Sequence, residues 1–409
     1  MTASASPSDP YGFGIPETWH EPYPLYARLR EEAPVYYSEA WKSWVLTRCA
    51  DAGVMKDPRV SARRSGGFAA TLPEEIRRMI EPLIRNLSMW VLLTDPPDHT
   101  RLRGLINKAF TPRLTEQLRP RIQRLVTDLL DEAAKKDEID LMKDFAVPLP
   151  VTVIGELMGL PRENRHRLKE WADDVLHFMA GTRRTPESIA TSVRALVELE
   201  TYLREVFAER RRHPGEDLLS HLLAAEEQGQ VLSEQELLST CTVVLFGGHE
   251  TTVNLICNAV HALFAHPAEL EKLRRSPELM PSAVEEFLRY DTPVQRIGRV
   301  AKEDLELGGQ RIQKGQALWL MIGSANRDPA HFPDPDRLDV ARRDNRHVAF
   351  GTGAHFCVGA PLGRLEGQLA MAELLRRFPR LEPAGKPSRL ESATMRGFNS
   401  YPLRLGAPA

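Results

Sequence analysis

A long apolar run starts behind Ser233 and continues to Leu263. Ser233 and Glu236 have the spacing of a capping box, in which two side chains bind each other's backbone N–H groups at the start of a helix. The run behind this box is about thirty residues long, which exceeds the usual length of a helix in a globular protein. The sequence therefore predicts one long helix that crosses the hydrophobic core.

Helical periodicity extends well beyond this run. Residues 99–263 are mostly helical by period, because apolar side chains recur at spacings of three and four. The clearest series is Leu118, Ile122, Leu125, Leu129 and Ala133. Residues 361–378 predict another helix near the end of the chain.

The remaining segments predict a small β region. A short helix is expected at residues 23–32, and residues 34–38 and 43–47 alternate like the two strands of a hairpin. After Asp291, Pro, Gly and Asp separate short β-branched pieces. Because no linker or internal repeat interrupts the pattern, we expect a single domain over residues 1–409, mainly α with a small β component (α+β).

The composition excludes several classes of protein. Lys and Arg number 54 and Asp and Glu 56, so a net charge of -2 gives no general basis for binding nucleic acid or an anionic membrane. No leader pattern and no window of about 18 apolar residues is present, which predicts a cytoplasmic protein without a membrane anchor. The four cysteines are widely spaced and lack zinc-site spacing. Cys241 and Cys257 lie in apolar helical patterns, where we expect them to be buried.

Residues 350–363 (FGTGAHFCVGAPLG) carry the most specific chemical signal. Glycines on both sides of Cys357 allow a tight turn and let a flat ligand approach the backbone. A helix is expected directly behind Cys357, and the positive end of its dipole stabilises a thiolate. The segment resembles the signature of the cytochrome P-450 family, Phe-Gly-x-Gly-x-[His/Arg]-x-Cys-x-Gly, at every fixed position. It departs from the usual family pattern at Gly363, where Ala is common.

This resemblance covers nearly the whole chain and carries expectations for fold and cofactor. It implies the cytochrome P-450 fold, a helical prism with heme b (iron protoporphyrin IX) buried between the long helix and the cysteine loop. Cys357 is then the axial ligand of the iron, and Phe350 and Gly351 bind the cofactor. An axial thiolate pushes electron density onto iron and favours O–O bond cleavage, so Cys357 implies oxygen activation.

A second matching motif lies within the long helix, at residues 247–252 (GGHETT). It is similar to the family's [Ala/Gly]-Gly-x-[Asp/Glu]-Thr motif, which passes over the heme. Its glycines let the helix approach the porphyrin, and a hydroxyl that competes for a backbone carbonyl can open a local groove. Glu250 and Thr251 are therefore the expected catalytic residues for proton delivery. His249 is expected to be structural.

Cationic partners for the two heme propionates are implied by the same resemblance. His99 and Arg103 are four residues apart, which places them on one helix face suited to a carboxylate. Arg299 and His355 are expected to join them. Arg296, three residues before Arg299, remains an alternative.

Glu286 and Arg289 form the family's Glu-x-x-Arg motif, followed by residues 325–329 and 332–342, which resemble the family's meander region. Carboxylate and guanidinium three residues apart share one helix face. By resemblance they stabilise the fold beneath the heme, and we expect a structural rather than a catalytic role.

The expected reaction is insertion of one oxygen atom from O2 into a lipophilic small molecule, by hydroxylation or epoxidation, in secondary metabolism. A polyketide, terpenoid or steroid fits the apolar character of the expected pocket segments. These segments are a loop at residues 65–90 and residues 178–183, 243–247, 294–297 and 398–399. The chain is expected to act as a monomer that receives electrons from a separate ferredoxin and ferredoxin reductase. Lys108, Arg113, Arg346 and Arg364 are the candidate docking residues for an acidic ferredoxin.

Two other functions use the same cofactor. One is a sensor or carrier of small ligands, and the other is a peroxygenase or a catalyst of rearrangements. Glu250 and Thr251 favour a monooxygenase over both, since a carrier needs no proton delivery and a peroxygenase usually replaces the acid–alcohol pair. A requirement for electron-transfer partners would distinguish these functions.

Overall fold

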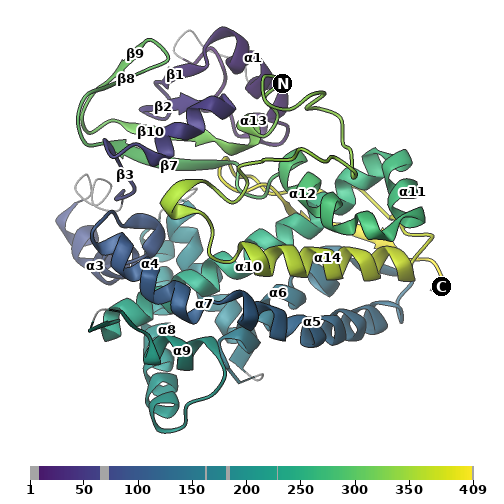
Figure 1. The fold of residues 1–409 in the computed structure, drawn as a ribbon, viewed down its shortest axis with the longest axis horizontal. Coiled ribbons are helices and arrows are strands. Elements are labelled where there is room, and N and C mark those ends of the chain that lie inside the picture. The colour runs from purple at the N-terminus through teal and green to yellow at the C-terminus, as the bar shows by residue number, and fades with distance from the viewer. Residues whose placement is uncertain (1–8, 65–72, 162–163, 181–184, 228, 408–409) are drawn as a thin grey trace. The chain divides into compact units, whose positions relative to one another are not determined.

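The computed structural model describes residues 9–64, 73–161, 164–180, 185–227 and 229–407 (Figure 1). Contacts between residues divide the chain into two compact units. The first comprises residues 1–61, 123–148 and 251–409, and the second comprises residues 62–122 and 149–250. The helices α5 (Pro112–Ala133) and α10 (Glu234–Ala265) belong partly to each unit. A single functional domain over residues 1–409 stays a prediction.

The first unit contains a five-stranded sheet that begins with the predicted hairpin. Strands β1 (Val35–Ser38) and β2 (Ser43–Leu46) pair antiparallel, with Val35 opposite Leu46. The sheet has the order β1-β2-β10-β7-β3, which adds β10 (Ala317–Met321), β7 (Arg296–Ala301) and β3 (Val60–Ser61). The short helix α1 is found at Tyr23–Glu32, as predicted. Leu46, Leu318 and Leu320 are buried in one apolar cluster, so packing of the strands' side chains stabilises the sheet.

The described part of the first unit also contains four further α-helices and several small strands. The helices are α11 (Pro267–Arg275), α12 (Met280–Tyr290), α13 (Ile322–Ala325) and α14 (Ala360–Arg377). The small strands are β4 (Glu138–Asp140), β8 (Leu305–Leu307), β9 (Gln310–Ile312), β11 (Glu382–Pro383), β12 (Ser388–Arg389), β13 (Phe398–Ser400) and β14 (Pro402–Arg404). Helix α14 confirms the predicted C-terminal helix. A Cβ atom on Gly367 of α14 would lie 3.0 Å from Leu255 of α10 and 3.4 Å from Val284 of α12, so these helices pack closely.

The second unit is almost entirely helical. Its helices are α3 (Glu74–Ser88), α4 (Asp98–Ala109), α6 (Pro148–Leu157), α7 (Arg165–Ala180), α8 (Pro186–Arg212) and α9 (Leu218–Ala224), and β5 (Glu226–Glu227) pairs with β6 (Gln230–Val231). The prediction of a loop at residues 65–90 is wrong for residues 74–88. There Ile80, Leu83 and Leu87 follow helical spacing and are buried, which makes α3 an amphipathic helix. Residues 65–72 and 181–184 of the expected pocket segments lie outside the described residues.

The long helix α10 has 32 residues and begins with the predicted capping box. The Ser233 N–H donates to Glu236 Oε2 at 2.8 Å, and the Glu236 N–H donates to Ser233 Oγ at 3.3 Å. A Cβ atom on Gly248 would overlap Ile154 of α6 at 2.2 Å. In the second unit, Gly248 therefore serves close packing of α10 on α6. Within the described residues, no helix combines the length and apolar composition that crossing a membrane requires.

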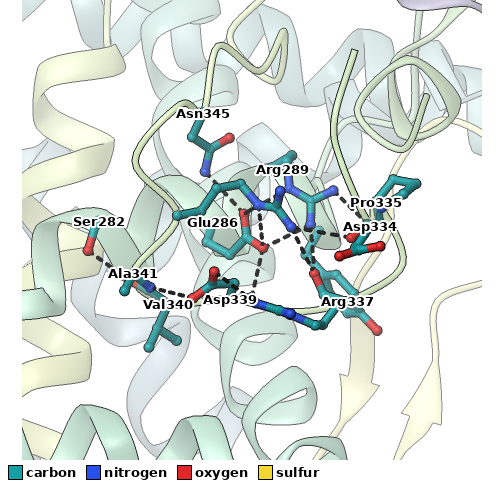
Figure 2. Close-up of polar contacts among 12 residues, drawn as sticks. Ser282, Glu286, Arg289, Asp334, Pro335, Arg337, Asp339, Val340, Ala341 and Asn345 are labelled. Atoms are coloured by element: carbon teal, nitrogen blue, oxygen red, sulfur yellow. Dashed lines mark hydrogen bonds and ion pairs between the residues drawn. The ribbon is translucent and has the colours of Figure 1, made fainter. Parts of the chain in front are cut away.

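Glu286 and Arg289 form a fully buried ion pair on α12 (Figure 2). Arg289 Nε and Nη2 donate to the two carboxylate oxygens of Glu286, each at 2.8 Å. The remaining guanidinium donors reach backbone carbonyls of Asn326, Pro335 and Arg337. Because the charge is paired and its donors are used, the pair can be buried without the large penalty of an isolated ion.

The carboxylate of Glu286 also binds the segment that follows α13 (Figure 2). It accepts hydrogen bonds from the Asp339 N–H at 2.9 Å, from Arg342 Nε at 3.1 Å and from Asn345 Nδ2 at 3.1 Å. Asn326, whose carbonyl binds Arg289, accepts a bond from the Val348 N–H at its Oδ1 at 2.8 Å. These are the contacts of a structural ion pair, and they reach the segment that enters the cysteine loop.

We expect Arg289→Ala to lower the free energy of unfolding by about 3–5 kcal/mol, because it leaves the Glu286 charge buried without its partner. Urea denaturation followed by circular dichroism measures this change. Lys135→Ala is the control, since it breaks an ion pair with Glu132 whose side chains are 66% and 71% exposed. It should have a much smaller effect. Equal effects of the two substitutions would show that the buried pair does not stabilise the fold as described.

Candidate active site

The cysteine loop is a tight turn built on two left-handed glycines. Gly351 and Gly353 have φ angles of 73° and 71°, a conformation that other residues rarely adopt. The Gly351 N–H donates to the Val348 carbonyl, and the Cys357 N–H donates to the Phe350 carbonyl, both at 2.9 Å. The predicted cofactor residues Phe350, Gly351 and Cys357 are thus brought together in one hydrogen-bonded turn of the first unit.

Cys357 differs from the other three cysteines in its exposure. Its side chain is exposed, whereas Cys241 and Cys257 are completely buried, as predicted. Burial raises the pKa of both buried thiols far above the ordinary value, so they stay protonated. Burial also raises the pKa of Cys49 to about 11. Helix α14 starts at Ala360, close behind Cys357, where the helix dipole can stabilise a thiolate.

The first unit also carries two of the expected propionate partners. His355 ends the short helix η7 (Gly353–His355), and Arg299 is a buried residue of β7. Arg296, the alternative, lies over the rings of Trp41 and Trp319 at 4.0 and 4.3 Å. Residues three apart on a strand face opposite sides. The stacking of Arg296 between two tryptophans therefore favours Arg299 for the propionate.

His99 and Arg103 lie in the second unit, on the first two turns of α4. The helical spacing predicted for them is present, so both project from one face. His99 is buried and Arg103 is half-buried. This pair offers an imidazole and a guanidinium to the same ligand, which suits a carboxylate.

Glu250 and Thr251 are consecutive residues of α10, and Glu250 is assigned to the second unit and Thr251 to the first. Glu250 Oε2 is buried and makes no hydrogen bond to the described residues. The pKa of Glu250 is raised to about 7, mainly by burial and also by Asp173, against the opposing effect of His249 and Lys169. A carboxyl group with a pKa near neutrality is suited to donate and accept protons.

His249 has the structural role that the sequence predicted. Its Nδ1 lies 2.7 Å from the Leu245 carbonyl, four residues back on α10, and its Nε2 lies 3.3 Å from Asp173 Oδ1 on α7. Helix α10 is an unbroken α-helix through residues 247–252, so the local groove expected beside Thr251 is not marked by a helix break.

Helices α10 and α14 meet near both motifs within the first unit. A Cβ atom on Gly363 would lie 3.9 Å from Thr252 Oγ1 and 4.0 Å from the Phe350 ring. These are ordinary van der Waals distances, so Ala, which is common in the family, would also fit at Gly363. Within the first unit, the part of α10 that contains Thr252 therefore lies next to α14, the helix that follows Cys357.

Residues of each unit, taken separately, have the chemistry that a heme with a thiolate ligand would require. The thiol of Cys357 is exposed and Glu250 has an unpartnered buried oxygen. A Cβ atom on Gly247 would meet no atom of the described chain within 4 Å, so a flat group can approach α10 at this residue. The imidazole and guanidinium groups described above are the predicted partners of the propionates.

Comparisons with known proteins give the family. The family model described as Cytochrome P450 matches residues 74–404. The chain belongs to the cytochrome P450 family. It is a monooxygenase, an oxidoreductase with a heme-iron cofactor, and P450 enzymes use redox partners and small-molecule substrates.

Its relatives are bacterial, and some act in secondary metabolism. The chain is 43% identical over 394 residues to cytochrome P450 107B1 of Saccharopolyspora erythraea, covering 93% of this chain and 94% of that protein. It is 40% identical to the polyketide biosynthesis cytochrome P450 PksS of Bacillus subtilis, covering 95% and 97%. The structure of P450BioI in complex with a hexadec-9Z-enoic acid ligated acyl carrier protein matches with a TM-score of 0.88 at 38% identity, covering 95% and 99%.

One residue of the expected docking surface has a different environment from the prediction. Arg364 was expected to be exposed, but it is half-buried and binds both carboxylate oxygens of Glu285, at 2.7 and 2.8 Å. Sequence analysis missed this pairing because Glu285 lies on α12, 79 residues away. One signal was available in the sequence. Glu285 directly precedes Glu286, and Glu286 was already assigned to the fold through the Glu-x-x-Arg motif, so Glu285 was a second acid with no assigned partner.

The pKa of Glu250 predicts how the coupling of the P450 should depend on pH. A carboxyl group with its pKa raised to about 7 holds a proton below that pH and loses it as the pH rises through 7. We therefore expect product formed per NAD(P)H to fall between roughly pH 6 and pH 8 in the wild type. Glu250→Gln should give a low value that does not change over this range. The role of Glu250 would be contradicted if product per NAD(P)H did not change with pH in the wild type. It would also be contradicted if Glu250→Gln showed the same pH dependence as the wild type.

Proposed function

We propose that this P450 is a heme b monooxygenase that inserts one oxygen atom from O2 into a lipophilic secondary metabolite. The observation that carries the proposal is the place of Cys357, whose N–H binds the Phe350 carbonyl in a glycine turn directly before α14. When bound, heme supplies oxygen activation, and an axial thiolate favours O–O cleavage. His99, Arg103, Arg299 and His355 would bind the two propionates, and Phe350 and Gly351 would contact the cofactor.

Glu250 and Thr251 deliver the protons that this reaction consumes. The buried Oε2 of Glu250 holds a proton near neutral pH because burial raises the pKa of the carboxyl group to about 7. The hydroxyl of Thr251 can accept one hydrogen bond and donate another, so it can pass on a proton. Thr251 follows Glu250 directly on α10. Such a pair supports a monooxygenase more than a ligand carrier, which needs no proton transfer.

The substrate class rests on the relatives. The polyketide biosynthesis relative favours a polyketide-like molecule, and the match to P450BioI adds an acyl chain carried by a protein as a second form of lipophilic substrate. Hydroxylation or epoxidation of a free substrate is the simplest reaction, since it needs no protein to present the molecule. A spectral-shift screen with free and carrier-bound compounds separates the two forms.

We also propose a ferredoxin with its reductase as the electron donor, docking beside the cysteine loop. A hollow of about 400 Å³ lies there, and its lining includes Lys56, Arg346 and Phe356. Lys56 is an exposed cation, Arg346 is exposed and pairs with Asp344 at 3.0 Å, and Phe356 is 41% exposed. Cations around an exposed aromatic ring complement an acidic partner. Arg364 contributes less than expected, because Glu285 neutralises its charge.

Cys357→His tests the iron ligand. We expect the variant to lose monooxygenation, because imidazole does not give the electron push of a thiolate. The reduced, carbon-monoxide-bound spectrum should lose the red-shifted Soret band of thiolate ligation. Cys49→Ala is the control and should keep the band. Persistence of the band in Cys357→His would refute the assignment of Cys357.

Thr251→Ala tests proton delivery. We expect substrate binding to remain close to normal while reducing equivalents are diverted into hydrogen peroxide, because the controlled proton donor is lost. The measurement is product and peroxide formed per NAD(P)H. Thr252→Ala is a matched control on the same helix, and its coupling should equal that of the wild type. If Thr251→Ala also keeps wild-type coupling, Thr251 does not have this role.

A further inference from the structure

The carboxylate of Glu285 joins three segments of the first unit. It lies on α12 and accepts two hydrogen bonds from Arg364 of α14, at 2.7 and 2.8 Å. It also lies 3.1 Å from Nε2 of His347, in the segment that enters the cysteine loop. One acidic side chain therefore binds a residue before Cys357 in the chain and a residue after it.

His347 is held in one tautomer by the loop itself. The Ala349 N–H donates to His347 Nδ1 at 3.2 Å, so this nitrogen carries no proton. The proton is therefore on Nε2, which donates to Glu285. Only 3% of the His347 side chain is exposed, which makes this a shielded contact. Glu285 thus fixes the orientation of a ring that itself holds a backbone amide of the loop.

On the other side of the loop, Arg364 carries the contact to the Phe350 ring. Its guanidinium lies 4.6 Å from the centre of that ring. The Phe350 carbonyl accepts the hydrogen bond of the Cys357 N–H at 2.9 Å. A chain of direct contacts therefore runs from Glu285 through Arg364 and Phe350 to Cys357.

We propose that Glu285 is a positioning residue for Cys357, because it fixes both ends of the cysteine loop through His347 and Arg364. The proposal rests on the proposed function, in which Cys357 is the iron ligand. Glu285 is expected to determine how long the Cys357 thiolate stays bound to the iron. With Gln in place of Glu285, one uncharged acceptor oxygen remains for the donors of Arg364 and His347, so the charge-assisted hydrogen bonds are lost.

The electrostatics of Glu285 agree with a strong interaction. Burial acts to raise the pKa of its carboxyl group, but the hydrogen bonds from His347 and Arg364 outweigh burial and lower the pKa to about 2. The carboxylate is therefore charged at any pH at which the enzyme works. A neutral substitute of the same shape removes the charge with little change in packing.

Glu373 provides a matched comparison on α14. Its carboxylate also binds an arginine through two hydrogen bonds, to Arg376 at 2.6 and 2.8 Å. Its side chain is 25% exposed, against 26% for Glu285. However, Glu373 and Arg376 are three residues apart on one helix, and neither lies in the cysteine loop. Loss of this pair tests the effect of an ion pair alone.

The experiment compares Glu285→Gln with Glu373→Gln in the heme-loaded enzyme. In mild denaturant, we measure the rate at which the reduced, carbon-monoxide-bound protein loses its thiolate Soret band. We expect Glu285→Gln to lose the band on the order of tenfold faster than wild type, since a charge-assisted hydrogen bond is removed. Glu373→Gln should follow the wild-type rate. Equal rates in the two variants would overturn the proposal.

A double-mutant cycle with Arg364→Gln supplies a readout that a general loss of stability would not give. If the two side chains act through one contact, Glu285→Gln with Arg364→Gln should lose the band no faster than the worse single variant. If the rate increases of the two single variants multiply in the double variant, the two side chains act independently and the proposal is contradicted. If Glu285→Gln does not incorporate heme, Glu285→Asp replaces it with the same expected direction. A wild-type protein without a thiolate band would instead overturn the proposed function, and this inference with it.

Discussion

The buried ion pair of Glu286 and Arg289 is the interaction on which the first unit depends. Two full charges with no exposed surface are tolerated because the pair is bidentate and its other donors and acceptors are used. Those contacts organise an irregular segment that has little regular secondary structure of its own. Through Asn326, the same network holds the Val348 N–H, and the cysteine loop starts from that residue.

Neighbouring acids on α12 therefore serve two purposes. Glu286 faces the interior and fixes the segment after α13, while Glu285 faces the cysteine loop and the start of α14. Helix α14 in turn packs against α10, which carries Thr251. The path from the ion pair to the chemistry passes through packed helices and hydrogen bonds, so the geometry of the loop is set by the surrounding scaffold. This arrangement suits a thiolate that must keep one position through repeated turnover.

Local sequence signals predicted much of this protein because they depend on residues close together in the chain. The glycine turn around Cys357, the capping box at Ser233 and the hairpin of β1 and β2 are all of this kind. The identity of the partner of Arg364 could not be read this way, since it depends on how α12 and α14 pack. A structural reason to prefer Arg299 over Arg296 came only from the aromatic neighbours of Arg296. The amphipathic α3 was missed although its spacing was visible, and the ligation and proton-delivery roles remain predictions.

The central claim is that the thiolate of Cys357 binds the heme iron. Iron X-ray absorption of the purified heme protein measures the atoms bound to the metal directly. Replacing Cys49, Cys241 and Cys257 by alanine leaves Cys357 as the one cysteine, so a thiolate signal can come from no other residue. The account predicts one sulfur neighbour at a bonding distance in this variant, as in the wild type. A shell of nitrogen and oxygen atoms alone would contradict it.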